Sequence, residues 1–99
     1  MARILIIDDE VLILNVLKTV LTDDGHEAVT ANGGQQALDL ISARRFDLVI
    51  SDLRMAPIDG IEVLRELRAK HLSTPVIMIT AYGTVKAAVD ALSLDVFDF

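Results

Sequence analysis

The 99-residue chain contains no cysteine and no tryptophan, and it has only two prolines and four aromatic residues. The absence of cysteine excludes disulfides, thiolate metal sites and cysteine nucleophiles, and it fits a reducing compartment. Long apolar runs are missing too, because the first one, at residues 4–7, stops at Asp8 and none approaches the length of a membrane span. We therefore expect a cytoplasmic protein without a membrane partner.

Basic residues are also scarce. The chain has nine lysines and arginines and fifteen acidic residues, which gives a net charge of −6. The densest basic cluster is the pair Arg44 and Arg45. Such a surface does not attract nucleic acid or anionic lipid, so we expect no direct nucleic-acid contact by this segment. What the chain does have is a hydrophobic content of 53% with 24% charged residues, which is typical of one compact domain with an aliphatic core.

Short apolar runs alternate with segments of helical spacing along the chain. The runs are residues 4–7, 28–31, 48–51 and 76–80, and residues 97–99 would begin a fifth. This alternation predicts parallel strands joined by helices, and right-handed crossovers then favour a doubly wound, flavodoxin-like α/β sheet of order 2-1-3-4-5. Strands one and three would lie side by side at the switch point, where ligands bind beyond the carboxyl ends of the strands.

Each intervening segment predicts a helix with one apolar face. The first helix should cover about residues 11–21. The inner residues that we expect are Ile13, Val16, Leu17 and Val20 in the first helix, Ala37, Leu38 and Ile41 in the second, Ile61, Leu64 and Leu67 in the third, and Val85, Ala88, Val89 and Leu92 in the fourth.

Three carboxylates and a hydroxyl should meet at the switch point. Asp8 and Asp9 follow the first strand, Asp52 closes the third and Thr80 closes the fourth. Singly, each could be a helix cap, a turn former or an ordinary strand residue. Together, three close carboxylates repel one another, and a divalent cation is the simplest compensation. Oxygen ligands without histidine or cysteine at ligand spacing favour Mg²⁺.

A carboxylate beside such an ion can attack phosphorus, and Asp52 is the best candidate nucleophile. The loop that follows it can offer the Arg54 backbone carbonyl to the same ion. The Thr80 hydroxyl could then donate a hydrogen bond to an added phosphoryl oxygen, which would draw its loop inward.

These segments resemble the receiver domain of two-component response regulators over essentially the whole chain, residues 1–99. Residues 4–10 are similar to the family's first strand and acidic pair, residues 52–55 with Pro57, Asp59 and Gly60 to its phosphoacceptor loop, and residues 79–82 to its switch hydroxyl segment, and Phe99 falls at its switch aromatic.

The resemblance implies a phosphorylation-dependent switch rather than a turnover enzyme. Asp52 would accept a phosphoryl group from a phosphohistidine on a sensor histidine kinase. Mg²⁺ would be held by Asp9, Asp52 and the Arg54 carbonyl, and Asp8 would contact the ion through water. Thr80 and Phe99 would respond to the added charge.

Residues 59–64 and 80–85 are most similar to receivers that precede the ATPase of nitrogen-regulation-class transcriptional activators. This resemblance implies an output domain beyond Phe99, with ATPase and DNA-binding functions. The family's lysine and fifth helix would also follow Phe99, so we expect a domain truncated in or after its fifth strand. Leu14 and Leu21 would then lie exposed and favour self-association as a homodimer. Ala56 and Pro57 replace the family's usual Pro and Gly, which alters the loop but preserves the spacing from Asp52 to Gly60.

Two other functions stay open. The chain could be a receiver-like docking or dimerisation module that is never phosphorylated, although the joint presence of Asp8, Asp9, Asp52 and Thr80 argues against this. An aspartyl-phosphate hydrolase would share the nucleophile logic, but that family places its nucleophile on the first strand with an acid two residues later, whereas Asp8 and Asp9 are adjacent.

Overall fold

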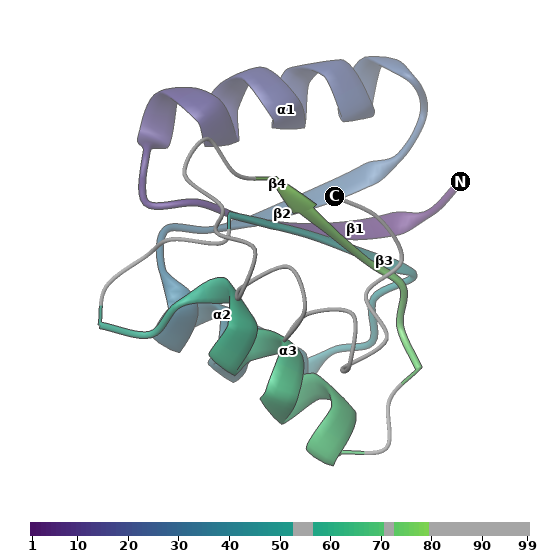
Figure 1. Cartoon of the computed structure of the whole chain (residues 1–99). Coiled ribbons are helices and arrows are strands. Elements are labelled where there is room, and N and C mark those ends of the chain that lie inside the picture. Colours follow the sequence, from purple (N-terminus) through teal and green to yellow (C-terminus); the bar gives the residue numbers. More distant parts are fainter. Residues whose placement is uncertain (53–56, 71–72, 80–99) are drawn as a thin grey trace.

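The computed structural model describes residues 1–52, 57–70 and 73–79 (Figure 1). Its elements are β1 (Arg3–Ile7), α1 (Val11–Asp23), β2 (Glu27–Ala31), α2 (Gly34–Ala43), β3 (Leu48–Asp52), α3 (Gly60–Ala69) and β4 (Val76–Ile79). The strands form one parallel sheet of order β2-β1-β3-β4, which confirms the predicted doubly wound arrangement. The expected fourth helix and fifth strand fall outside the described residues.

The sheet is covered on both faces, with α1 on one side and α2 and α3 on the other (Figure 1). Side chains alternate between the two faces along each strand. In β1, Leu5 and Ile7 join the larger core under α2 and α3, whereas Ile4 and Ile6 face α1. All four are at most 3% exposed, so β1 is buried on both sides, as a central strand of a parallel sheet should be.

The inner face of α1 differs from the prediction. Leu14 is buried at 5% exposure, with Leu17 and Leu21 packed beside it on the sheet, whereas Val16 and Val20 are 54% and 57% exposed. The prediction that Leu14 and Leu21 would be exposed is therefore wrong. Apolar residues surround most of this helix, so its sequence offers two overlapping stripes with helical spacing, and contact with the sheet selects the one through Leu14.

The start of α3 is fixed by a side-chain cap. Asp59 precedes the helix, and its Oδ1 accepts a hydrogen bond from the Glu62 backbone N–H at 2.9 Å. This bond satisfies one of the backbone donors that a helix start leaves without a partner. Among the described residues, no helix has the length and apolar content needed to cross a membrane.

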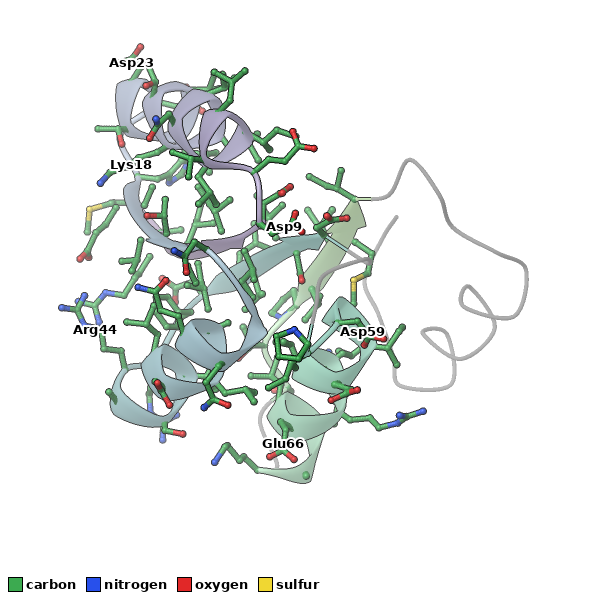
Figure 2. All side chains as sticks on the ribbon, turned by 90° about the vertical axis from the view of Figure 1, so that its left-hand side faces the viewer. Asp9, Lys18, Asp23, Arg44, Asp59 and Glu66 are labelled. Atoms are coloured by element: carbon green, nitrogen blue, oxygen red, sulfur yellow. The ribbon has the colours of Figure 1, made fainter. Side chains whose placement is uncertain are left out.

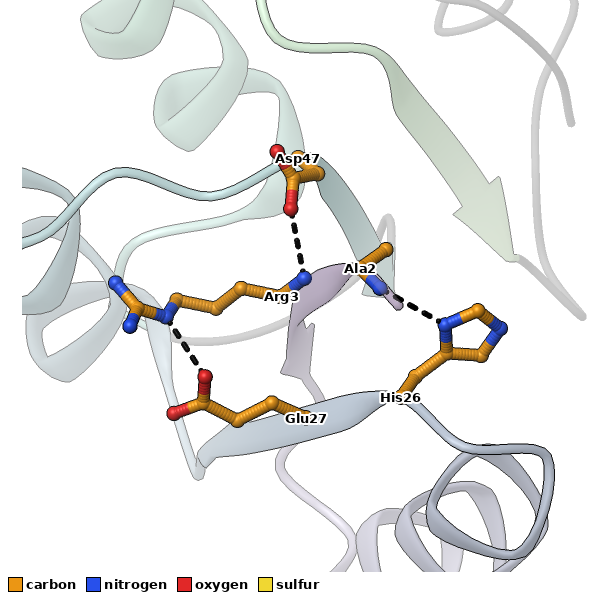
Figure 3. A network of polar contacts seen from close by, with 5 residues as sticks. All are labelled: Ala2, Arg3, His26, Glu27 and Asp47. Atoms are coloured by element: carbon orange, nitrogen blue, oxygen red, sulfur yellow. Dashed lines mark hydrogen bonds and ion pairs between the residues drawn. The ribbon is translucent and has the colours of Figure 1, made fainter.

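Polar contacts join the amino ends of β1, β2 and β3 (Figure 3). The Arg3 guanidinium donates to Glu27 Oε2 at 3.0 Å, and the Arg3 backbone N–H donates to Asp47 Oδ2 at 2.8 Å. Beside them, the Ala2 backbone N–H donates to His26 Nδ1 at 3.1 Å. These contacts tie the first residues of the chain to segments that lie more than twenty residues away in sequence.

Candidate functional site

Three aspartates meet at the carboxyl end of the sheet. Asp8 and Asp9 directly follow β1, Asp52 is the last residue of β3, and these strands are neighbours in which Ile7 pairs with Ser51. One carboxylate oxygen from each aspartate lies within 4.8 Å of the other two. The structure therefore confirms that the three carboxylates lie close together, as predicted.

The three carboxylates differ in their access to solvent. Asp8 is only 5% exposed, Asp52 is half-buried and Asp9 is exposed. Figure 2 shows Asp9 at the same end of the molecule as Asp59 and far from Arg44. The site therefore runs from a buried carboxylate to an open one, and an incoming group would approach from the Asp9 side.

Asp8 is held in place by two backbone contacts. Its own N–H donates to the Ala31 carbonyl at 3.1 Å, and its Oδ1 accepts from the Glu10 N–H at 2.9 Å. Burial raises the pKa of Asp8 above its usual range, the Glu10 hydrogen bond opposes this, and the nearby charges of Asp52 and Asp9 raise the pKa further. The folded chain therefore holds this carboxylate at an electrostatic cost.

The backbone of Asp52 is positioned by Ser51, which the sequence did not single out, and by Gly60, which the sequence placed only in the phosphoacceptor-loop motif. The hydroxyl of the fully buried Ser51 donates to the Asp52 carbonyl oxygen at 3.0 Å. Gly60, the first residue of α3, packs so closely that a Cβ there would overlap the same oxygen. A polar residue at a buried strand position and a glycine at a helix start were the available signals, and both are weak without a structure.

The donor chemistry of the cluster fits a hard divalent cation. Asp8, Asp9 and Asp52 offer only carboxylate oxygens, which suit Mg²⁺ better than zinc or copper. His26 lies at the other end of the sheet, where its Nδ1 accepts a hydrogen bond from the Ala2 backbone N–H. The remaining predicted site residues, Arg54, Thr80 and Phe99, lie outside the described residues.

Comparisons with known proteins agree with this geometry. A family model for the response regulator receiver domain matches residues 4–99. The transcriptional regulatory protein ZraR of Escherichia coli O157:H7 is 41% identical over 96 residues, which are 97% of this chain and 22% of that protein. The regulatory protein AtoC of Escherichia coli strain K12 is 43% identical over 97 residues, 98% of this chain and 21% of that protein. The chain thus spans about a fifth of the length of these relatives.

Among solved structures, the response regulator TrrA of Thermotoga maritima, in complex with Mg²⁺ and BeF, has a TM-score of 0.88 and 36% identity, and the match covers 99% of this chain and 84% of that one. The name of ZraR, a transcriptional regulatory protein, agrees with the expected link to transcriptional activators. The chain belongs to the response regulator receiver domain family.

Proposed function

We propose that the chain is a phosphorylation-dependent signalling switch in which Asp52 accepts a phosphoryl group from a phosphohistidine of a sensor histidine kinase. The observation that carries this proposal is the 4.8 Å cluster of Asp8, Asp9 and Asp52 at the switch point of the sheet. Three carboxylates this close repel one another. A bound cation would offset this repulsion and would help Asp52 to accept a phosphoryl group.

In the proposed transfer, an Asp52 carboxylate oxygen forms the new bond to phosphorus while the bond from phosphorus to the donor imidazole nitrogen breaks. The electron pair of that bond stays on the imidazole. Mg²⁺, when bound, would neutralise charge on the phosphoryl oxygens. Asp9, Asp52 and the Arg54 carbonyl would hold the ion, and Asp8 would reach it through water.

The chain's own residues supply positioning. Ser51 and Gly60 both contact the backbone carbonyl oxygen of Asp52, so the nucleophile keeps its place at the end of β3. The Glu10 N–H holds the Asp8 carboxylate at the cluster. Fixed geometry of this kind lowers the entropic cost of bringing nucleophile and phosphorus together.

The readout that we propose is a population shift rather than turnover of an outside substrate. The charge added at Asp52 would draw in the Thr80 hydroxyl and reorient Phe99. In a longer cytoplasmic protein this shift, with or without homodimer formation, would control an output domain with ATPase and DNA-binding functions. The name of ZraR, a transcriptional regulatory protein, supports such an output.

The test is to incubate the protein with Mg²⁺ and a small acyl-phosphate donor and to measure its intact mass. We expect one base-labile phosphoryl group on the wild-type protein and none on Asp52→Asn. Asp59→Asn is the matched control, because Asp59 is another carboxylate at the same end of the sheet and asparagine can also cap α3. This variant should label like the wild type.

Other outcomes of this labelling experiment would indicate a different function. A wild-type protein that stays unmodified, also within a longer chain that includes the family's lysine, would make it a docking or dimerisation module. A phosphoryl group found on Asp8 or Asp9 by peptide mapping would instead indicate the hydrolase chemistry.

A further inference from the structure

A second site lies at the amino end of the sheet, far from the aspartates. Two adjoining hollows open there between the carboxyl ends of α2 and α3, with volumes of about 190 Å³ and 380 Å³. They share Ile41, Arg44 and Arg45, and Lys70 borders the larger one. Figure 2 shows Arg44 on the opposite side of the molecule from Asp9. A ligand at these hollows would therefore not contact the candidate phosphoacceptor site.

The smaller hollow has an apolar floor. Ile41, Phe46, Val49 and Leu67 line it, and each is at most 9% exposed. These four belong to the core between the sheet and the two helices, so the floor is held by the fold itself. A rigid apolar floor that opens to solvent can receive an apolar group without rearrangement of the domain.

The rim of the hollows is positively charged, although the whole chain carries −6. Arg44, Arg45 and Lys70 are exposed, and within the described part of the chain none of them lies within 4.0 Å of a carboxylate oxygen. The carboxylate that lines the smaller hollow, Asp47, already accepts a hydrogen bond from the Arg3 N–H. The rim thus offers three cations to an external anion.

The volume of the smaller hollow limits what can enter it. Small-molecule sites usually measure about 300 Å³ or more. A hollow of about 190 Å³ instead suits a single large side chain, and buried apolar anchors of this kind dominate many protein interfaces. The surrounding cations would pair with carboxylates on either side of such an anchor and favour acidic partners over basic ones.

We propose that the hollows between α2 and α3 dock an acidic segment of a partner protein, which inserts one leucine-sized side chain onto the floor formed by Ile41, Phe46, Val49 and Leu67 and pairs its carboxylates with Arg44, Arg45 and Lys70. The docked segment would not contact Asp52, because the two sites lie at opposite ends of the sheet.

Fluorescence anisotropy with three labelled peptides tests this proposal. The first peptide carries one leucine between two pairs of glutamates, the second has alanine in place of the leucine, and the third has glutamines in place of the glutamates. We expect saturable binding of the first peptide only, weakened about tenfold when the salt concentration rises from about 50 to 200 mM, since exposed charges are screened.

Variants of the protein assign the binding to these hollows. Arg44→Gln with Arg45→Gln should weaken the leucine peptide about tenfold or more, whereas Arg65→Gln, an exposed cation on α3 outside the hollows, should bind like the wild type. Thr74→Met adds volume beside the floor without changing charge, and it should also weaken the leucine peptide. Thermal unfolding of each variant confirms that it is folded.

Three results would overturn the proposal. The first is equal binding of the leucine and alanine peptides, which would leave only a charged patch. The second is displacement of the leucine peptide by millimolar inorganic phosphate, which would indicate a small-anion site. The third is unchanged peptide affinity in the Arg44 and Arg45 double variant, with loss only of thermal stability, which would make these cations simple partners of the helix carboxyl ends.

Discussion

The two ends of the sheet differ in their electrostatics. At the carboxyl end, Asp8, Asp9 and Asp52 place three like charges within 4.8 Å of one another. At the amino end, the Arg3 guanidinium pairs with the opposite charge of Glu27, and the Arg3 backbone N–H donates to Asp47. Opposite charges brought together stabilise a fold modestly, whereas like charges brought together oppose folding.

This difference separates function from stability. Polar contacts at the amino end link β1, β2 and β3, and their role is structural. At the carboxyl end, by contrast, burial and the neighbouring charges of Asp52 and Asp9 raise the pKa of Asp8, so its charged form is disfavoured in the folded chain. Residues that act against the folded state are expected where chemistry is performed, and here they coincide with the switch point of the sheet.

The largest effect that we expect comes from filling the contact behind Asp52. Gly60→Ala would press a methyl group onto the Asp52 carbonyl oxygen and should lower the free energy of unfolding by about 2 to 3 kcal/mol, with slower labelling by a phosphodonor. Urea unfolding measures the first effect. Gly33→Ala is the matched control, since a Cβ there meets nothing within 4 Å, and it should change stability by less than about 1 kcal/mol. Equal losses in both variants would show that Gly60 does not act through Asp52.

The pH dependence of stability should single out Asp8. Because its folded pKa is raised, the folded chain keeps a proton on Asp8 at pH values where the unfolded chain has already released it. The contribution of Asp8 to the free energy of unfolding therefore falls as pH rises from its unfolded pKa through its folded pKa.

In Asp8→Asn this contribution is absent. In chelator, the free energy of unfolding of the variant should rise relative to that of the wild type as pH rises through that window. Below the window the two free energies should converge. Urea unfolding at a series of pH values measures the gap. A gap that is constant with pH would contradict the raised pKa of Asp8.

The smallest effect is expected at the amino end. Arg3→Gln removes the contact with Glu27, but both side chains are about 40% exposed, so the loss should be below about 1 kcal/mol and should shrink at high salt. A double-mutant cycle with Glu27→Gln isolates the coupling of the pair. A coupling larger than the effect of Gly60→Ala would reverse the contrast drawn between the two ends.

Much of this architecture could be predicted because it depends on period and order along the chain. Alternating apolar runs indicated the parallel sheet, and residues that directly follow strands must lie at its carboxyl end, which brought Asp8, Asp9 and Asp52 together. The inner stripe of α1 could not be predicted in the same way, since Val16 and Leu14 are equally apolar and only packing on the sheet distinguishes them. The roles of Ser51 and Gly60 depend on contacts between β3 and α3 that no local pattern records.

We infer that the carboxyl-end aspartates reduce the stability of the fold, and that together they bind a divalent cation. The most direct measurement is the free energy of unfolding of wild type and Asp8→Asn at neutral pH, in chelator and in excess Mg²⁺. We expect Asp8→Asn to be the more stable protein in chelator, and Mg²⁺ to stabilise the wild type more than the variant and to reverse the order. A wild-type protein that is already the more stable one in chelator, and that gains nothing from Mg²⁺, would contradict it.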